Sequence, residues 1–239
     1  MRLAIYSVCN GAISILKRVN IAIDGPSGAG KSSLAKNIAK HFGYIYVDTG
    51  ALYRGIGYFM ISSGISPSDT ETVKEKLREI ELSFKHIDGI QHVFVNGCDV
   101  TDKIRTKEVS MAASAVSAIP EVRAFLLDCQ RNIASEHNIV MDGRDVGTVI
   151  LPNADVKIFL TASAEDRATR RHEEQLASGM DSDYGETLRL IKQRDIQDST
   201  RATAPLKKAD DAVMLDNSGF KEEDTLNAAM KIISEKLGE

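Results

Sequence analysis

Residue types and patterns that are rare or missing in this sequence exclude several classes of protein. It contains no tryptophan, and no apolar run approaches the roughly 20 residues that a membrane-spanning helix needs. Its three cysteines, Cys9, Cys98 and Cys129, are scattered and lack metal-ligand spacing, which favours free thiols in a reducing compartment over disulfides or a zinc site. Positive charge is not in excess either, since 30 Lys and Arg stand against 34 Asp and Glu and the net charge is −4. We therefore expect a cytoplasmic protein with no membrane and no nucleic-acid partner.

The N-terminal segment has little that would target it for export. Its two short apolar patches are broken by Asn10-Gly11, and no small-residue cleavage site follows them. A new apolar run begins directly afterwards, at Val19. We expect residues 1–18 to be a poorly ordered extension without a function of its own, and residues 19–239 to form the folded domain.

The most informative segment follows that run. It matches the pattern G-x-x-x-x-G-K-[ST] and comprises Gly25, Pro26, Ser27, Gly28, Ala29, Gly30, Lys31, Ser32 and Ser33. A helical stretch follows at once, so the context is strand, glycine-rich turn and helix. The glycines let successive N–H groups point at phosphate oxygens, Lys31 can reach the β- and γ-phosphates, and the Ser32 hydroxyl suits Mg²⁺. The segment predicts a nucleoside triphosphate site.

Apolar runs typical of buried parallel strands recur along the chain, with helical patterns between them. They lie at 19–23, 44–48, 138–142, 155–160 and 211–215. This alternation predicts a three-layer α/β/α fold around a five-stranded parallel sheet, with ligands bound at the carboxyl ends of the strands.

The gap between the second and third runs, about 90 residues, is too long for one crossover. Within it the pattern predicts an antiparallel hairpin turning at Asp88-Gly89, a further short strand at Val100–Ile104, and helices at Lys107–Ala118 and Glu121–Ser135. We expect a small β-containing subdomain at about 67–135, inserted between core segments 19–66 and 136–239.

Charged residues follow the second and third runs. Asp48 can hold a Mg²⁺-bound water and Arg54 can bind a phosphate through its planar fork, although a helix cap and a solvated arginine explain this pair equally well. After the third run, Arg144 can meet phosphate, and Asp145 can accept a hydrogen bond from a base amino group. The alternative here is a plain salt bridge between these two side chains.

Arginines also gather on two predicted helices further on. Arg167, Arg170 and Arg171 lie on a helix that begins near Ser163, and Arg194, Asp198 and Arg201 share one helix face downstream. A glycine-bearing loop joins the helices. Beside a phosphate-binding loop, this pattern predicts a lid at about 163–190 more readily than a solvated charged hairpin. An acceptor that is itself an ionised phosphate needs no strong general base, which fits a site rich in arginine.

Taken together these segments resemble the bacterial cytidylate kinases, within the P-loop nucleoside monophosphate kinase superfamily. The resemblance runs from about Asn20 to the C-terminus. Besides the glycine-rich loop it rests on Asp48–Arg54, Ile104–Val109, Ala113-Ser114 with Val122-Arg123, Asp142–Thr148, and the run from Arg194 to Leu206. It implies transfer of the γ-phosphoryl group of ATP to CMP or dCMP with Mg²⁺, by a monomer. The preference between ribose and deoxyribose stays open.

The resemblance also implies roles for single residues. Residues 25–33 bind ATP, the metal is held by Ser32 and Asp48, and the catalytic residues are Lys31, Arg144, Arg170 and Arg194. The acceptor is bound by Thr49, where the family usually has serine, and by Tyr53, Arg54, Ser114, Arg123, Arg144, Asp145, Arg194, Asp198 and Arg201. Of these, Ser114, Arg123 and Asp145 read cytosine. Uracil would present an acceptor to Asp145 and leave its carboxylate unpaired, which discriminates strongly.

Three other functions compete with this one. The first is a P-loop kinase for UMP or another small acceptor such as a metabolite. The second is a GTPase-type switch, although the sequence lacks an Asn-Lys-x-Asp guanine-reading motif. The third is a regulatory module that binds ATP without catalysis, which the number of arginines available for a second phosphate disfavours.

Overall fold

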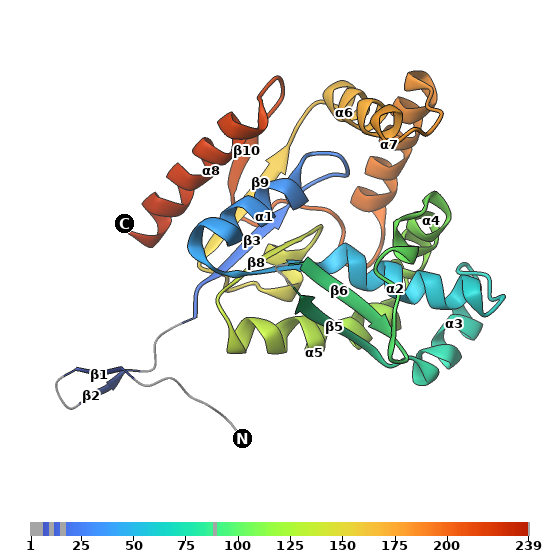
Figure 1. The fold of residues 1–239 in the computed structure, drawn as a ribbon, viewed down its shortest axis with the longest axis horizontal. Coiled ribbons are helices and arrows are strands. Elements are labelled where there is room, and N and C mark those ends of the chain that lie inside the picture. The colour runs from blue at the N-terminus through green and yellow to red at the C-terminus, as the bar shows by residue number, and fades with distance from the viewer. Residues whose placement is uncertain (1–6, 10–11, 15–17, 88–89, 239) are drawn as a thin grey trace.

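The computed structural model describes residues 7–9, 12–14, 18–87 and 90–238. Its centre is a five-stranded parallel sheet with the strand order β10-β9-β3-β8-β4 (Figure 1). The strands are β3 (Asn20–Asp24), β4 (Ile45–Asp48), β8 (Ile139–Gly143), β9 (Val156–Thr161) and β10 (Val213–Asp216). The predicted α/β fold and its parallel sheet are confirmed.

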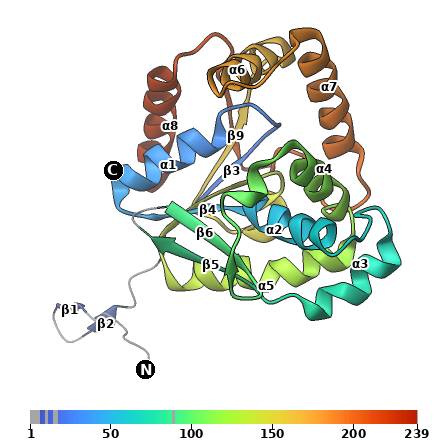
Figure 2. The same cartoon turned by 45° about the vertical axis from the view of Figure 1, so that its right-hand side comes forward.

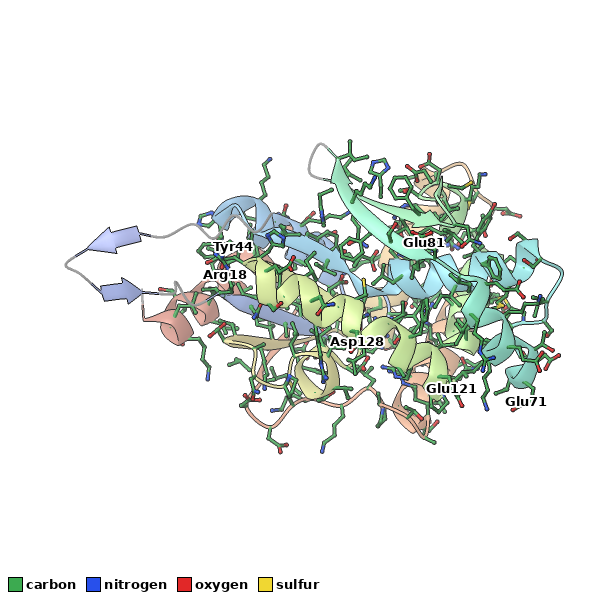
Figure 3. The ribbon with its side chains drawn as sticks, turned by 90° about the horizontal axis from the view of Figure 1, so that it is seen from below. Arg18, Tyr44, Glu71, Glu81, Glu121 and Asp128 are labelled. Atoms are coloured by element: carbon green, nitrogen blue, oxygen red, sulfur yellow. The ribbon has the colours of Figure 1, made fainter. Side chains whose placement is uncertain are left out.

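Helices cover both faces of this sheet, because side chains alternate along each buried strand. On β3, Ile21 and Ile23 pack among side chains of α1 (Lys31–Phe42) and α8 (Glu222–Leu237). Ala22, between them, faces the opposite layer with α5 (Pro120–Glu136). Figure 3 shows α5 along the underside of the molecule, with Asp128 in its middle. These layers bury both sides of the central strands, as a parallel sheet requires.

The region between β4 and β8 contains a second, antiparallel sheet. Its elements are α2 (Thr49–Ser62), α3 (Thr70–Lys76), β5 (Leu82–Ile87), β6 (Ile90–Val95), β7 (Cys98–Asp99) and α4 (Lys107–Val116). The strand order is β5-β6-β7, and the predicted turn at Asp88-Gly89 lies outside the described residues.

The short strand expected at Val100–Ile104 is wrong. The third strand is β7, and Lys103–Arg105 forms a short 3₁₀ turn instead. The physical reason is a side chain that replaces the backbone ladder: the Thr101 hydroxyl accepts the hydrogen bond of Val93 N–H at 3.0 Å and itself donates to Asp99. The backbone still donates from Val100 N–H to the Val93 carbonyl at 2.9 Å, and the chain turns away from β6 after that residue.

The helices α6 (Ala164–Ala177) and α7 (Tyr184–Thr200) form a pair beyond the carboxyl end of β9 (Figure 2). The Ser163 hydroxyl accepts a hydrogen bond from Asp166 N–H at 3.0 Å and so caps α6, which begins next to Ser163 as the sequence predicts. Arg201 comes directly after the last residue of α7. Whether this pair moves as a lid stays a prediction.

The N-terminal pair β1 (Ser7–Cys9) and β2 (Ala12–Ser14) is antiparallel and forms a separate two-stranded sheet (Figure 1). The prediction of a poorly ordered extension falls largely outside the described residues. Among the helices of the described ranges, none is long and apolar enough to span a membrane alone, and the pair α4 and α5 meets that criterion only jointly, across a bend of 99°.

Candidate active site

The glycine-rich loop connects β3 to α1, with Gly25, Gly28 and Gly30 at φ values of 151°, 78° and 87°. A Cβ at Gly25 would lie 1.9 Å from the carbonyl oxygen of Leu160, so no other residue fits there. The first turn of α1 has no side-chain cap. Its N–H groups and its dipole therefore form a site suited to an anion.

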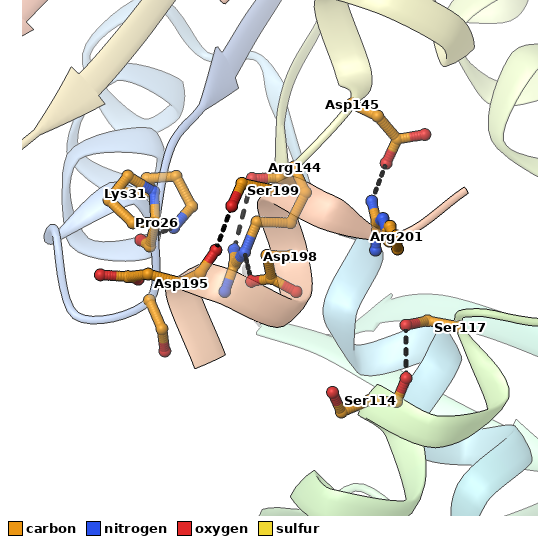
Figure 4. Close-up of polar contacts among 12 residues, drawn as sticks. Pro26, Lys31, Ser114, Ser117, Arg144, Asp145, Asp195, Asp198, Ser199 and Arg201 are labelled. Atoms are coloured by element: carbon orange, nitrogen blue, oxygen red, sulfur yellow. Dashed lines mark hydrogen bonds and ion pairs between the residues drawn. The ribbon is translucent and has the colours of Figure 1, made fainter. Parts of the chain in front are cut away.

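Lys31 is buried in this loop, and its Nζ donates to the carbonyl of Pro26 at 2.6 Å (Figure 4). Burial, reinforced by the nearby Arg144, lowers the pKa of Lys31 to about 7. An anionic phosphate would reverse both effects, because it supplies the negative charge that a buried ammonium lacks. Ser33, the last residue of the predicted loop, is exposed.

Ser32, in the first turn of α1, contacts Asp142 near the end of β8. Its hydroxyl donates to Asp142 Oδ2 at 2.8 Å, and Tyr46 donates to the other oxygen at 3.0 Å. Burial, followed by the charge of Asp48, raises the pKa of Asp142 to about 6. The hydroxyl of Thr49 donates to the Asp142 carbonyl at 2.8 Å. Asp142 begins the motif Asp142–Thr148, but no pattern in the sequence predicts a role for it.

Asp48, predicted as the second metal ligand, has other partners. It caps α2 by accepting from Ala51 N–H at 2.9 Å, and it pairs with Arg54 at 2.7 Å. The structure thus has the helix cap that the sequence left open as the alternative, and its metal role stays a prediction. Ser32 and Asp142 nevertheless offer the hydroxyl and carboxylate oxygens that Mg²⁺ prefers, so the residues present fit this ion.

Three predicted phosphate-binding arginines, Arg54, Arg144 and Arg194, converge beyond the loop. Arg144 donates to Asp198 at 2.9 Å, and not to its neighbour Asp145. Burial and the charge of Arg144 lower the pKa of Arg194 to about 10. The Nε atoms of Arg54 and Arg194 are buried and have no hydrogen-bond partner within the described part of the chain. Unpaired buried donors beside like charges mark a place where an anion fits.

Two of the predicted base-reading residues, Arg123 and Asp145, meet at a second cluster. Arg123 donates to Asp145 and lies over the ring of Tyr53, with its guanidinium carbon 5.5 Å from the ring centre. The carboxylate of Asp145 also faces Arg201, at 3.6 Å (Figure 4). All of these side chains are buried or nearly so. Asp145 therefore pairs with Arg123, 22 residues away. The alternative considered from the sequence was a salt bridge between Asp145 and its neighbour Arg144.

Ser114 and Arg201 reach this cluster by different routes. Ser114, in the last turns of α4, accepts a hydrogen bond at its carbonyl from the Ser117 hydroxyl, and the Ser117 carbonyl accepts one from Arg123 at 3.1 Å. Arg201 donates through Nε to the carbonyl of Ala204 at 2.7 Å, and Ala204 has a φ of 47°. Such a conformation is strained for alanine and is held where the surroundings require it.

Arg170 is linked to the glycine-rich loop through Asn217, a residue that the sequence motifs do not mark. It donates to the side chain and the carbonyl of Asn217, whose Nδ2 donates to the Ala29 carbonyl at 3.1 Å. Its predicted place at the transferred group stays a prediction. Asn217 directly follows β10, so the rule that ligand sites lie at the carboxyl ends of parallel strands would have singled it out.

Arg167 is a second residue that was not assigned a role. Its guanidinium pairs with both oxygens of Asp195, at 2.9 and 2.7 Å, and also donates to the carbonyl of Ser27 at 3.1 Å. It therefore connects α6, α7 and the glycine-rich loop. No sequence pattern separates it from Arg170 and Arg171, since the three lie on one helix.

Comparison with known proteins agrees with this geometry. The family profile described as cytidylate kinase matches residues 21–235. A cytidylate kinase of Caldicellulosiruptor bescii is 48% identical over 217 residues, which cover 91% of this chain and 96% of the relative. One of Geobacillus kaustophilus is 46% identical over 222 residues, which cover 93% and 99%.

The fold has a counterpart among solved structures as well. An uncharacterized protein from Eubacterium ventriosum superposes with a TM-score of 0.51 at 12% identity, over 91% of this chain and 99% of that one, a likeness of fold alone. The sequence relatives go further, because they are nearly half identical along almost the whole chain and the profile covers the glycine-rich loop and both arginine clusters. This chain belongs to the cytidylate kinase family.

Proposed function

We propose that this chain transfers the γ-phosphoryl group of ATP to CMP or dCMP and releases ADP with CDP or dCDP. Membership of the cytidylate kinase family carries the reaction. The observation that supports it best concerns Arg144, which donates to Asp198 at 2.9 Å and whose positive charge lowers the pKa of both Lys31 and Arg194. Arg144 is therefore near the loop for the donor as well as the arginines for the acceptor.

Phosphoryl transfer requires only that the lysine and arginines of the site be correctly placed and positively charged. The acceptor phosphate is already ionised near neutral pH, so its oxygen attacks without a general base. Lys31 would hold the β- and γ-phosphates of ATP, and Arg54, Arg144 and Arg194 would hold the acceptor phosphate. Their fixed positive charges would offset the negative charge that spreads over the transferred group. Crowded arginines are costly in the empty site and favourable around two phosphates.

Ser32 and Asp142 would hold Mg²⁺, with Asp48 as the further carboxylate nearby. When bound, the ion neutralises charge on the phosphate oxygens of ATP. The support is chemical, because a hydroxyl and a carboxylate lie within 2.8 Å of each other beside the loop. Arg170 is proposed to approach the transferred group once it leaves Asn217.

Asp145, Arg123 and Ser114 would recognise the base. A carboxylate offers more lone pairs than Arg123 and Arg201 occupy, so Asp145 can still accept from the cytosine amino group. Arg123 would donate to the ring acceptors of cytosine, and Tyr53 supports its guanidinium. Asp198 and Arg201 would contact the sugar. The proposal includes a monomer acting in the cytoplasm, with the helical pair α6–α7 closing as a lid.

A coupled assay with product analysis tests this function. ADP release from ATP and Mg²⁺ should depend on added CMP, and anion-exchange chromatography should show one CDP for each ADP. Hydrolysis of a nucleoside triphosphate at the same rate with and without CMP would instead indicate a switch-type NTPase and overturn the proposal.

The N-terminal segment offers a separate test. Removal of residues 1–18 should leave kcat/KM for CMP and the thermal midpoint unchanged, because β1 and β2 pair only with each other among the described strands. Activity and circular dichroism measure the two quantities. A lower midpoint or lost activity would show that the segment stabilises the domain.

A further inference from the structure

The outer edge of the main sheet is where the inserted subdomain meets the active site. β4 is an edge strand, and among the described strands it pairs with β8 alone. In a strand, both backbone polar groups of one residue point to the same side, and alternate residues point to opposite sides. Ile45 donates toward β8, to the carbonyl of Asn138, so Tyr46 and Asp48 direct their backbone groups outward. Exposed edge groups of this kind need partners.

Two side chains of the hairpin β5–β6 supply these partners. Gln91 accepts from Asp48 N–H at 2.8 Å and donates to the Asp48 carbonyl at 3.2 Å. His86 donates through Nε2 to the Tyr46 carbonyl at 2.6 Å. Gln91 and His86 are directly opposite each other in the hairpin. Gln91 and His86 thus bond backbone groups that a sixth strand would otherwise pair with, at Tyr46 and Asp48 just before α2.

Asp48 is the point at which this contact meets the acceptor site. Its side chain caps α2 and pairs with Arg54. Gln91 is 7% exposed, so its carboxamide has little access to water and holds both backbone groups of Asp48 in a fixed plane. A direct chain of contacts thus runs from Gln91 through Asp48 to the guanidinium proposed for the acceptor phosphate.

The packing of α2 transmits this placement. A Cβ at Gly55 would lie 2.9 Å from Leu82 of the hairpin, and a Cβ at Gly57 would lie 2.9 Å from the backbone nitrogen of Ala113 in α4. The helix is therefore in close contact with the hairpin on one side and with the helix of Ser114 on another. Close-packed helices move as units, so a change at the N-terminus of α2 reaches Tyr53 and Arg54.

We infer that Gln91 is a positioning residue of the acceptor site: its carboxamide pairs with the backbone of Asp48 and so sets the start of α2 and the guanidinium of Arg54. The inference rests on the proposed function. It predicts that loss of this contact weakens binding of CMP and leaves binding of ATP in the absence of Mg²⁺ intact, because the glycine-rich loop and α1 do not contact Gln91 through any hydrogen bond in the described residues.

Three variants and two measurements test it. Gln91→Met keeps the length of the side chain and removes both hydrogen bonds, and Gln91→Asn stays polar but is too short to make both. Lys85→Met, on the exposed face of the same hairpin, is the matched control. By isothermal titration calorimetry, both Gln91 variants should bind CMP about tenfold more weakly, a typical effect of lost buried hydrogen bonds, and should bind ATP without Mg²⁺ as tightly as the native protein does.

Hydrogen exchange provides a readout that does not depend on the substrate. In Gln91→Met the amide of Asp48 should exchange faster, while that of Ile45, bonded on the inner side of the same strand, keeps its rate. If Gln91→Met does not fold, Gln91→Asn carries both measurements. Unchanged CMP affinity in the folded variants, or equal losses for CMP and ATP, would overturn the inference. Failure of the native protein to bind CMP would instead overturn the proposed function, and the exchange rates would still test the contact.

Discussion

Arg144→Ala is expected to lower kcat/KM for CMP by about a thousandfold, the upper range for loss of one charged group that acts on a transition state. The charge of this side chain lowers the pKa of both Lys31 and Arg194, and Arg144 is the proposed link between donor and acceptor phosphates. Its removal also leaves Asp198 without the guanidinium that donates to it. ATP affinity should change little, because the loop and α1 remain intact.

Steady-state kinetics and a fluorescent ATP-analogue titration separate these two effects. Arg189→Ala is the matched control, since Arg189 is an exposed arginine of α7 that pairs with Glu186. The control should keep native kinetics. If Arg144→Ala kept its kcat/KM, the acceptor phosphate would have to lie elsewhere.

Asp145→Asn is expected to lower kcat/KM for CMP by about a hundredfold and to reduce the preference for CMP over UMP, because an amide can donate to the uracil oxygen that a carboxylate repels. The substitution also removes a buried negative charge from Arg123 and Arg201. We therefore expect a lower thermal midpoint as well, since two buried guanidinium groups lose their counter-charge.

A control must separate lost stability from lost recognition. Asp211→Asn removes the carboxylate that pairs with the buried Lys157; Asp211 precedes β10, whereas Asp145 follows β8. It should lower the thermal midpoint and leave the ratio of kcat/KM for CMP to that for UMP unchanged. An equal ratio in native protein and Asp145→Asn would remove this residue from base recognition.

Much of the fold follows from local sequence. The five parallel strands are short apolar runs, and their carboxyl ends meet at one edge by the geometry of a parallel sheet, so polar residues after them could be assigned to one site. Asp48, Arg144 and Asp145 were found in this way. Asn217 obeys the same rule after β10 and was missed only because no motif marked it.

The remaining features depend on partners far along the chain. Gln91 binds a backbone 43 residues away, and Ser32 binds Asp142 across 110 residues. The local sequence pattern around Gln91 or Ser32 does not indicate a partner so far along the chain. The expected strand at Val100–Ile104 failed for a related reason, because one threonine hydroxyl took over a ladder hydrogen bond that apolar alternation alone assigns to the backbone.

The central claim is that this chain phosphorylates cytidine monophosphates in preference to other acceptors. A coupled ADP-release assay over CMP, dCMP, UMP, AMP, GMP and shikimate tests it most directly, with kcat/KM for each. The account predicts that CMP or dCMP exceeds UMP by about a hundredfold or more, since a mismatched hydrogen bond in a buried site leaves a carboxylate unpaired. Equal or faster turnover of UMP would contradict it.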